Sequence, residues 1–294
     1  MASLPKKLQN NFRKALTFVI LLFIVGAMSL LEQDLIRGAV DKVQIAFNRI
    51  KEFEPEEGYY VAFSGGKDSV VILDLVKRSG VKFDAHYNIT GVDPPELVRF
   101  IRDEFPDVER HRPEITMWQL IVKKMMPPTR LVRYCCEYLK ERGGKGRKVI
   151  TGVRWAESNK RKTRQVVETC FKSSHKFYVN PIIDWTDSDV WEYIHSTGIK
   201  YCHLYDEGFK RLGCIGCPMA GKNRLKEFAR WPRYEALYRK AFDKAAIANN
   251  LKFGDQYERK GGVHLRWTDG DAMFKWWMEE KHKKVLPDQS VMFE

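Results

Sequence analysis

The sequence is poor in cysteine and in acidic residues. Its six cysteines, in a chain of 294 residues, lie at positions 135, 136, 170, 202, 214 and 217. A disulfide-stapled secreted domain would be shorter and denser in cysteine, so this pattern favours a reducing compartment and a metal or cluster site. Acidic residues number 38 against 51 Lys and Arg, which leaves a net charge of +13. The chain also lacks internal repeats and low-complexity tracts, and its length predicts one large domain with an appendage or two small domains.

The excess of positive charge is concentrated between residues 121 and 180. This stretch contains sixteen Lys or Arg against four acidic residues. Charge alone allows two interpretations. The stretch is a solvated basic face, or it binds a polyanion, either the phosphates of a nucleotide or the backbone of a nucleic acid.

One long apolar run without charges covers residues 15–31, and basic residues precede it. The run is shorter than the roughly 20 residues that a membrane-spanning helix needs. Residues 1–27 therefore have three interpretations: an upstream extension of a chain that starts at Met28, a short membrane anchor, or a signal peptide. The first agrees with the cytoplasmic location that reduced cysteines indicate.

The residues after Met28 have the pattern of an amphipathic helix. Ser29 and Glu32 have the spacing of a capping box, in which each side chain accepts a hydrogen bond from the other residue's backbone N–H. Apolar side chains then recur at helical spacing from Leu31 to Ile50. The sequence therefore predicts a helix that starts near Ser29 and runs to Ile50.

Apolar strand-like segments alternate with helix-like segments through the middle of the chain. The predicted strands cover residues 59–63, 81–89 and 148–153, the predicted helices cover 69–77, 94–105, 116–126 and 186–195, and a further apolar segment covers 178–183. This alternation is typical of an α/β fold in which helices flank a parallel sheet. The pattern from Pro218 onward is helical and rich in aromatic residues. We expect residues 28–217 to form the main domain and residues 218–294 a small helical C-terminal subdomain.

A glycine-containing turn joins the strand at 59–63 to the helix at 69–77. Its sequence is Ser64-Gly65-Gly66-Lys67-Asp68-Ser69. Glycines let the backbone approach a ligand closely, and the unpaired N–H groups at the start of a helix attract an anion. The spacing is neither that of the P-loop nor that of the dinucleotide-binding loop. The turn therefore predicts a phosphate site of another type.

Four of the six cysteines form two closely spaced pairs. Cys135 and Cys136 are adjacent, and Cys214 and Cys217 flank Ile-Gly in a Cys-x-x-Cys turn. Thiolates at this spacing hold a tetrahedral metal ion or an iron–sulfur cluster. Adjacent cysteines are poorly placed to bind one zinc ion together, whereas the separate irons of a cubane can each take one. The alternative is a pair of buried structural cysteines together with a redox-active Cys-x-x-Cys turn.

The loop at 64–69 resembles the PP-loop of the adenine nucleotide α-hydrolase-like superfamily. A Cys-Cys pair followed later in the chain by Cys-x-x-Cys is similar to the adenylyl-sulfate reductase branch of the PAPS reductase family. The resemblance covers roughly residues 55–220. Further segments of the chain resemble this family and occur in the same order as in its members. They cover residues 133–136 and 139–140, then 151–154, 157–158 and 161, then 180–181, 185–186 and 189–191, and finally 204–209.

The resemblance implies an enzyme that acts on ATP or on an adenylyl sulfate (PAPS or APS), with Mg²⁺ as a further ligand. The nucleotide-binding residues would be Ser64, Gly65, Gly66, Lys67, Asp68, Ser69 and Gly152. Those that act on the phosphates or the sulfate would be Lys67, Asp68, Arg154 and Arg161, although each arginine also fits a surface charge on a basic loop. The ligands of a [4Fe-4S] cluster would be Cys135, Cys136, Cys214 and Cys217.

The chain departs from the family pattern in one respect. Reductases of this family attack sulfur with a cysteine in a C-terminal Glu-Cys-Gly-(Leu)-His segment, and here no cysteine follows Cys217. Cys170 and Cys202 are the thiols left for that role, and an ordinary buried cysteine is the alternative for each. The departure favours ATP-dependent activation and sulfur transfer, similar to the sulfur-transfer subunit of DNA phosphorothioation systems.

Three functions are therefore expected to compete. The first is sulfur transfer to a nucleic acid or a small acceptor, with the stretch 121–180 as the nucleic-acid contact and a sulfur-donor or electron-donor protein as partner. The second is reduction of an adenylyl sulfate with release of sulfite. The third is a non-catalytic nucleotide or redox sensor that binds nucleic acid through the same stretch.

Aromatic residues of the C-terminal region also have two interpretations. Trp231, Tyr234, Tyr238 and Phe242 fall at helical spacing and are interleaved with arginines. They form either a platform on which nucleobases stack or the apolar side of a packed helical region. The spacing favours the packed region.

Overall fold

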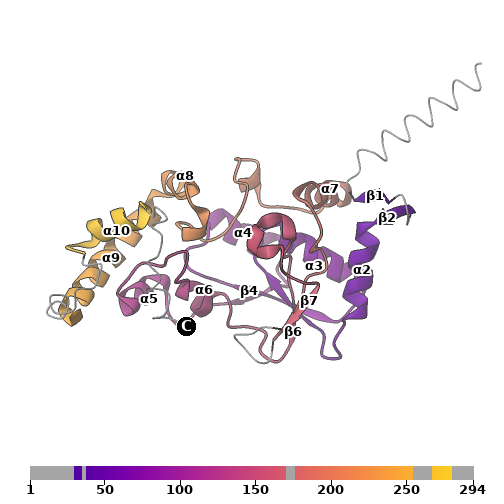
Figure 1. Ribbon diagram of the computed structural model, residues 1–294, viewed down its shortest axis with the longest axis horizontal. Helices are drawn as coiled ribbons and strands as arrows, with labels where there is room; N and C mark the ends of the chain where they lie inside the picture. The colour runs from indigo at the N-terminus through magenta and orange to yellow at the C-terminus, as the bar shows by residue number, and fades with distance from the viewer. Residues whose placement is uncertain (1–29, 35–37, 170–175, 254–266, 280–294) are drawn as a thin grey trace, which may run out of the picture. The chain divides into compact units, whose positions relative to one another are not determined.

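The chain folds into two structural units whose segments alternate along the sequence. The structure is a computed structural model, and it describes residues 30–34, 38–169, 176–253 and 267–279 (Figure 1). The first unit draws on residues 1–87, 96–109 and 144–212, and the second on 88–95, 110–143 and 213–294.

A six-stranded sheet forms the centre of the first unit, apart from its residues 88, 110 and 111, which belong to the second unit. Its strands, in order across the sheet, are β5 (Glu109–His111), β4 (Phe83–Asn88), β3 (Tyr59–Phe63), β6 (Lys148–Ile150), β8 (Phe177–Val179) and β7 (Val167–Thr169). β3 pairs in parallel with β4 and β6, and β6 pairs in parallel with β8, while β7 is antiparallel to β8. A central strand is covered on both faces, which explains why β3 is apolar at every position and almost entirely buried.

Helices flank this sheet, as the sequence predicts. They are α2 (Lys42–Glu52), α3 (Lys67–Ser79), α4 (Pro95–Glu104) and α7 (Asp187–Thr197), with the short 3-10 helices η1 (Trp155–Glu157), η2 (Asn159–Arg161) and η3 (His203–Tyr205) (Figure 1). The α3 helix packs against β3, α2 and α7. It ends at Gly80, whose left-handed φ of 76° is the usual way to close a helix. The predicted α/β fold with a mostly parallel sheet is confirmed.

The helix predicted from Ser29 to Ile50 is wrong in its first half. Strands β1 (Leu31–Asp34) and β2 (Gly38–Asp41) form an antiparallel pair there, and Glu32 of the predicted capping box lies in β1. The α2 helix begins only at Lys42, because Asp41 Oδ1 accepts hydrogen bonds from the N–H groups of Val43 and Gln44. Residues 1–29 lie outside the described part of the chain. Within the described part, no helix has both the length and the apolar character needed to cross a membrane.

Asp41 should therefore contribute measurably to stability. We expect Asp41→Ala to lower the free energy of unfolding by about 1 kcal/mol, because two backbone N–H groups lose their acceptor. Urea denaturation followed by circular dichroism measures the change. Asn48→Ala, at an exposed position of the same helix, is the matched control and should stay within about 0.5 kcal/mol of the wild type. Equal losses in the two variants would contradict the start of α2 at Lys42.

The second unit is mainly helical. Its helices are α5 (Met117–Lys124), α6 (Tyr134–Leu139), α8 (Asn223–Arg230), α9 (Pro232–Phe253) and α10 (Gly270–Met278), with the 3-10 helix η4 (Pro218–Ala220). The Tyr238 ring lies 4.9 Å from that of Trp277 and 5.0 Å from that of Trp118, and Trp231 and Phe242 are also buried. Buried rings cannot stack on nucleobases, so these side chains form a packed core.

Candidate functional site

The loop between β3 and α3 has a backbone conformation that requires glycine. Gly65 has a φ of 71°, in the left-handed region that favours glycine. A Cβ atom at this position would lie 2.7 Å from the Ile101 side chain. Gly66 is the N-cap of α3 and contributes no side-chain hydrogen bond to the start of the helix. The helix N-terminus therefore faces the loop without a capping side chain of its own.

The two serines of the loop hold it in this conformation. Ser69 Oγ donates a hydrogen bond to the Gly66 carbonyl oxygen over 2.8 Å and accepts one from the Ser64 N–H over 3.2 Å. The two hydroxyl oxygens lie 3.1 Å apart. The serines thus have a structural role that the sequence did not predict, and their role in nucleotide binding stays a prediction.

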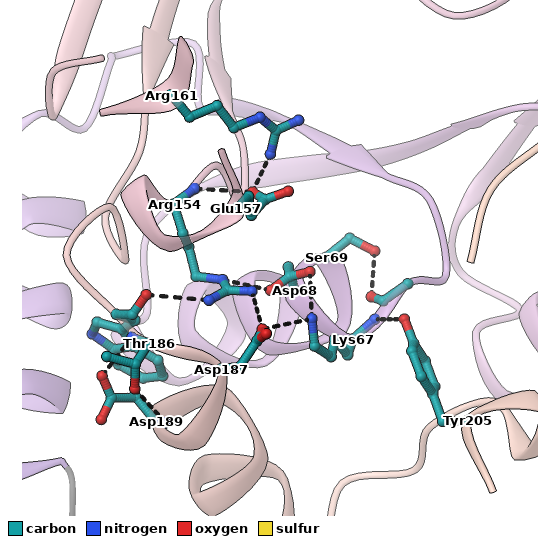
Figure 2. A network of polar contacts seen from close by, with 12 residues as sticks. Lys67, Asp68, Ser69, Arg154, Glu157, Arg161, Thr186, Asp187, Asp189 and Tyr205 are labelled. Atoms are coloured by element: carbon teal, nitrogen blue, oxygen red, sulfur yellow. Dashed lines mark hydrogen bonds and ion pairs between the residues drawn. The ribbon is translucent and has the colours of Figure 1, made fainter. Parts of the chain in front are cut away.

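Lys67 is the first residue of α3 and lies at the centre of a polar network. Its backbone N–H donates to the Tyr205 hydroxyl over 2.9 Å. Its Nζ atom lies 3.4 Å from Asp68 Oδ2 and 3.2 Å from Asp187 Oδ1, so the ammonium sits between two carboxylates (Figure 2). Lys67 is almost fully buried, which strengthens these interactions relative to a surface pair.

Arg154 joins the same two carboxylates from the other side. Its Nε donates to Asp68 Oδ1 and its Nη2 to Asp187 Oδ1, each over 2.7 Å, and its Nη1 contacts the Trp185 carbonyl oxygen (Figure 2). The Arg154 side chain is 1% exposed. Partial burial favours the neutral form of Asp187, but the hydrogen bond from Arg154 and the charge of Lys67 outweigh it and lower the Asp187 pKa. Arg154 is therefore a fixed, ionised donor and not a loose surface charge.

Arg161 and Gly152 have different positions relative to this network. The Arg161 guanidinium pairs with Glu157, which also accepts a hydrogen bond from the Arg154 backbone N–H over 3.1 Å (Figure 2). Arg161 is thus connected to the network through Glu157 and makes no direct ion pair with Asp68. A Cβ atom on Gly152 would lie 2.9 Å from the Asp68 carbonyl group, so only glycine lets this segment lie against the start of α3.

The four cysteines predicted as metal ligands all belong to the second unit. Cys135 and Cys136 open α6, and Cys214 and Cys217 flank the turn before η4. A hydrogen bond from the Cys135 thiol and the positive charge of Lys140 hold the pKa of Cys136 at about 6. That hydrogen bond, burial and the negative charges of the other three sulfurs raise the pKa of Cys135. The two pairs, distant in sequence, therefore interact electrostatically in space.

Lys140 and Tyr238 face the same group of sulfurs. The charge of Cys214 is the main cause that raises the pKa of Lys140. Burial raises the pKa of Cys214 to about 11, although Lys140 opposes this shift. Burial also raises the pKa of Tyr238, and the charges of Cys214, Cys135 and Cys217 raise it further. The charges of three of the four cysteines thus act on Tyr238.

Backbone hydrogen bonds fix the Cys-x-x-Cys turn. The Ile215 N–H donates to the Val92 carbonyl oxygen over 2.7 Å, and the Tyr238 hydroxyl donates to the Ile215 carbonyl oxygen over 3.0 Å. Gly216 has a φ of 73°. A Cβ atom there would lie 2.7 Å from the Phe228 ring and 2.9 Å from the Tyr238 ring. The turn therefore requires glycine both for its backbone conformation and for its packing.

We expect Gly216→Ala to lower the free energy of unfolding by about 2 kcal/mol, because it adds left-handed strain to an aromatic clash. Urea denaturation followed by circular dichroism measures the change. Gly198→Ala is the control, since its φ of 68° is also in the left-handed region and a Cβ there would have nothing within 4 Å. Equal stability losses in the two variants would contradict the packing role of Gly216.

Residues 58–220, more than half of the chain, match the phosphoadenosine phosphosulfate reductase domain. The chain belongs to the phosphoadenosine phosphosulfate reductase family. The matched range includes the loop at 64–69, Arg154 and the four cysteines of the second unit. The resemblance seen in the sequence is thereby confirmed.

Individual relatives in this family differ in length. Two uncharacterized proteins of Methanocaldococcus jannaschii are 30% identical over 248 residues and 29% identical over 193 residues, which cover 76% and 62% of this chain but 48% and 45% of the relatives. The chain thus spans about half the length of these relatives. The adenosine 5'-phosphosulfate reductase of Bacillus mycoides is 26% identical over 220 residues, 70% of this chain and 91% of that enzyme. A crystal structure of phosphoadenylyl-sulfate reductase from Candida auris aligns with 58% of this chain and 87% of its own, at 21% identity and a TM-score of 0.44.

Two residues of the polar network were missed by the sequence analysis as members of the site. Asp187 follows the N-cap Thr186. Its distance along the sequence from the loop matches no known motif, so nothing in the sequence assigns it to the site. Tyr205 lies within the segment 204–209 that matches the family, but its contact with the Lys67 N–H depends on the fold.

The basic stretch 121–180 is divided between the two units, and several of its arginines pair with carboxylates. Its role in nucleic-acid binding stays a prediction. Cys170 lies outside the described residues.

Proposed function

We propose that this chain is an iron–sulfur enzyme of the phosphoadenosine phosphosulfate reductase family that binds an adenine nucleotide and uses it in sulfur chemistry. The observation that carries this proposal is the junction of β3, the glycine loop and α3, with Lys67 and Arg154 buried beside it. An N-terminus of a helix together with two fixed cations is suited to a polyphosphate and offers little to a neutral ligand.

In the proposed complex, Lys67 and Arg154 bind phosphate oxygens. Both side chains are positioned before the ligand arrives, because Asp68 holds each of them. Donors that are fixed in advance stabilise charge that develops on a phosphate oxygen without having to reorganise during the reaction. Asp68 thus acts as a positioning residue, and Gly152 keeps the neighbouring segment close enough for this arrangement. Mg²⁺ would enter with the nucleotide.

We propose that Cys135, Cys136, Cys214 and Cys217 hold a [4Fe-4S] cluster. The grouping of four thiols and Lys140 in one unit fits this donor set, because the lysine offsets part of the negative charge that thiolates bring to a cluster. When bound, such a cluster would supply one-electron redox chemistry. The Tyr238 hydroxyl would support it by fixing the turn through Ile215.

For the reaction itself, we favour ATP-dependent sulfur transfer. An acceptor oxygen would attack the α-phosphorus of ATP, pyrophosphate would leave, and a sulfur donor would then displace AMP from the acceptor. Support comes from Cys202, which would be a poor nucleophile for reduction. Its side chain is fully buried, and burial raises the pKa of its thiol. The acceptor would be a nucleic acid or a small molecule.

Reduction of an adenylyl sulfate is the second candidate. The similarity to the adenosine 5'-phosphosulfate reductase of Bacillus mycoides, which extends over 91% of that enzyme, favours it. Reduction would release sulfite and would need a thiol that attacks the sulfur and an external electron donor. The two candidates therefore differ in substrate, in product and in the thiol that they require.

One experiment separates them. Protein purified without oxygen is assayed for iron and then incubated with ATP, with adenosine 5'-phosphosulfate and with its 3'-phosphorylated form. Release of pyrophosphate from ATP supports sulfur transfer, and release of sulfite with thioredoxin supports reduction. Nucleic-acid binding that weakens with salt, without either product, would instead support the sensor.

A further inference from the structure

Asp187 places a negative charge beside Lys67 of the loop and beside Arg154. Its Oδ1 atom accepts a hydrogen bond from Arg154 Nη2 over 2.7 Å and lies 3.2 Å from Lys67 Nζ (Figure 2). These are the side chains that the proposed function assigns to the nucleotide phosphates. A carboxylate oxygen in this position uses the same donors that a phosphate oxygen would use.

Asp187 is exposed to solvent, whereas Arg154 is buried. The Arg154 side chain is 1% exposed and is also held by Asp68 Oδ1 at 2.7 Å. The Asp187 side chain is 73% exposed. It stands in the first turn of α7, and the N-cap hydrogen bond of that helix is made by Thr186. Asp187 can therefore rotate toward solvent without unwinding α7, while Arg154 stays in place.

The charges of this network cancel only while Asp187 is in position. Lys67 and Arg154 carry two positive charges, and Asp68 and Asp187 carry two negative charges. Rotation of Asp187 toward solvent leaves a net positive charge beside the N-terminus of α3, where the helix dipole adds to it. The site is thus nearly neutral while Asp187 pairs with Lys67 and Arg154, and it attracts an anion when Asp187 has rotated toward solvent.

We propose that Asp187 is a displaceable anion that competes with nucleotide phosphates for Lys67 and Arg154 and so lowers the affinity of the site for them. This inference rests on the proposed nucleotide site and adds a residue that sets its affinity. The competition acts at the phosphate-binding groups. It therefore affects every ligand that presents a phosphate there, including inorganic pyrophosphate, and spares a ligand without phosphate.

The test is to remove the charge of Asp187 and keep its shape. Asp187→Asn should bind ATP and inorganic pyrophosphate on the order of tenfold more tightly than the wild type, since the competing charge-assisted hydrogen bond is worth about that factor. Isothermal titration calorimetry on the full chain, once in EDTA and once with Mg²⁺, measures the dissociation constants. Adenosine, which has no phosphate, should bind both proteins equally. Asp187→Ser should reproduce the gain if Asp187→Asn folds poorly.

Asp184→Asn is the matched control for the change in net charge. Its carboxylate pairs with Arg49 through two hydrogen bonds of 2.9 Å and makes no ion pair with the loop, so the affinity for pyrophosphate should not change. Unchanged or weaker pyrophosphate binding by Asp187→Asn in either buffer overturns the proposal, and so does an equal gain for adenosine. If neither the wild type nor the variant binds ATP or pyrophosphate, the nucleotide site itself is contradicted. Wild-type binding without a gain contradicts only the role of Asp187.

Discussion

Arg154→Met should weaken ATP binding at least about thirtyfold, because one fixed donor pair to the phosphates is lost. The variant should also be less stable by about 2 kcal/mol. Arg154 is buried between Asp68 and Asp187, and its removal leaves both carboxylates with Lys67 as their shared cation. Removal of one partner from a fully buried ion pair costs roughly 3–5 kcal/mol, and the exposure of Asp187 makes the cost here smaller. Titration calorimetry and urea denaturation measure the two effects separately.

Arg161→Met is the matched control for Arg154→Met. The sequence assigns both arginines to the site, but Arg161 pairs with Glu157 and makes no ion pair with Asp68. ATP affinity in Arg161→Met should therefore stay within about threefold of the wild type. If Arg161→Met loses turnover but keeps its affinity for ATP, the predicted catalytic role of Arg161 is retained. If a folded Arg154→Met variant binds ATP as tightly as the wild type, Arg154 does not contact the phosphates.

Local signals in the sequence were sufficient for the elements that position the loop. The uniformly apolar β3, the glycines at 65 and 66 and the closing Gly80 each dictate a conformation through their own chemistry. Periodicity alone was misleading between Leu31 and Asp41, where apolar spacing predicted a helix and the chain forms a two-stranded pair. There the stronger signal was Asp41, whose carboxylate caps the helix that actually forms.

The polar network shows which part of a site the sequence does not reveal. The sequence analysis identified Arg154 because it lies in a segment that resembles the family. It did not identify the side chains that surround Arg154. Its partners lie 86 and 33 residues away, at Asp68 and Asp187. No spacing rule connects such positions, because α7 brings Asp187 to the loop only when it packs against α3. The same reason applies to Tyr205, which reaches the Lys67 N–H from 138 residues away.

The cysteines illustrate the opposite case. Adjacent Cys135 and Cys136, with a Cys-x-x-Cys turn later in the chain, indicated one metal site before any fold was known. Both pairs belong to the second unit of the structure, although they are separated in sequence by a segment of the first unit, Gly144 to Leu212. The residue types and their short spacing thus led to one predicted site, and metal binding at that site stays a prediction.

Cys136→Ser should remove most of the iron from protein purified without oxygen. A serine hydroxyl does not supply the thiolate that an iron–sulfur cluster requires, and the hydrogen bond from Cys135 and the charge of Lys140 favour the thiolate form by lowering the pKa of Cys136. Because metal binding and folding are coupled, the variant should also lose stability relative to the iron-loaded wild type. An iron assay, the visible absorption of the cluster and thermal denaturation measure these effects.

Cys202→Ala is the matched control, and it also tests whether Cys202 is a reductase nucleophile. Cys202 belongs to the first unit and is fully buried, so its loss should leave the iron content unchanged. Release of pyrophosphate from ATP should continue, because sulfur transfer does not use this thiol. If Cys202→Ala instead abolishes sulfite release from an adenylyl sulfate, Cys202 is a reductase nucleophile despite its burial. If Cys136→Ser retains its iron, the four cysteines are not the ligands of a cluster, and the sulfur chemistry must be assigned to the nucleotide site alone.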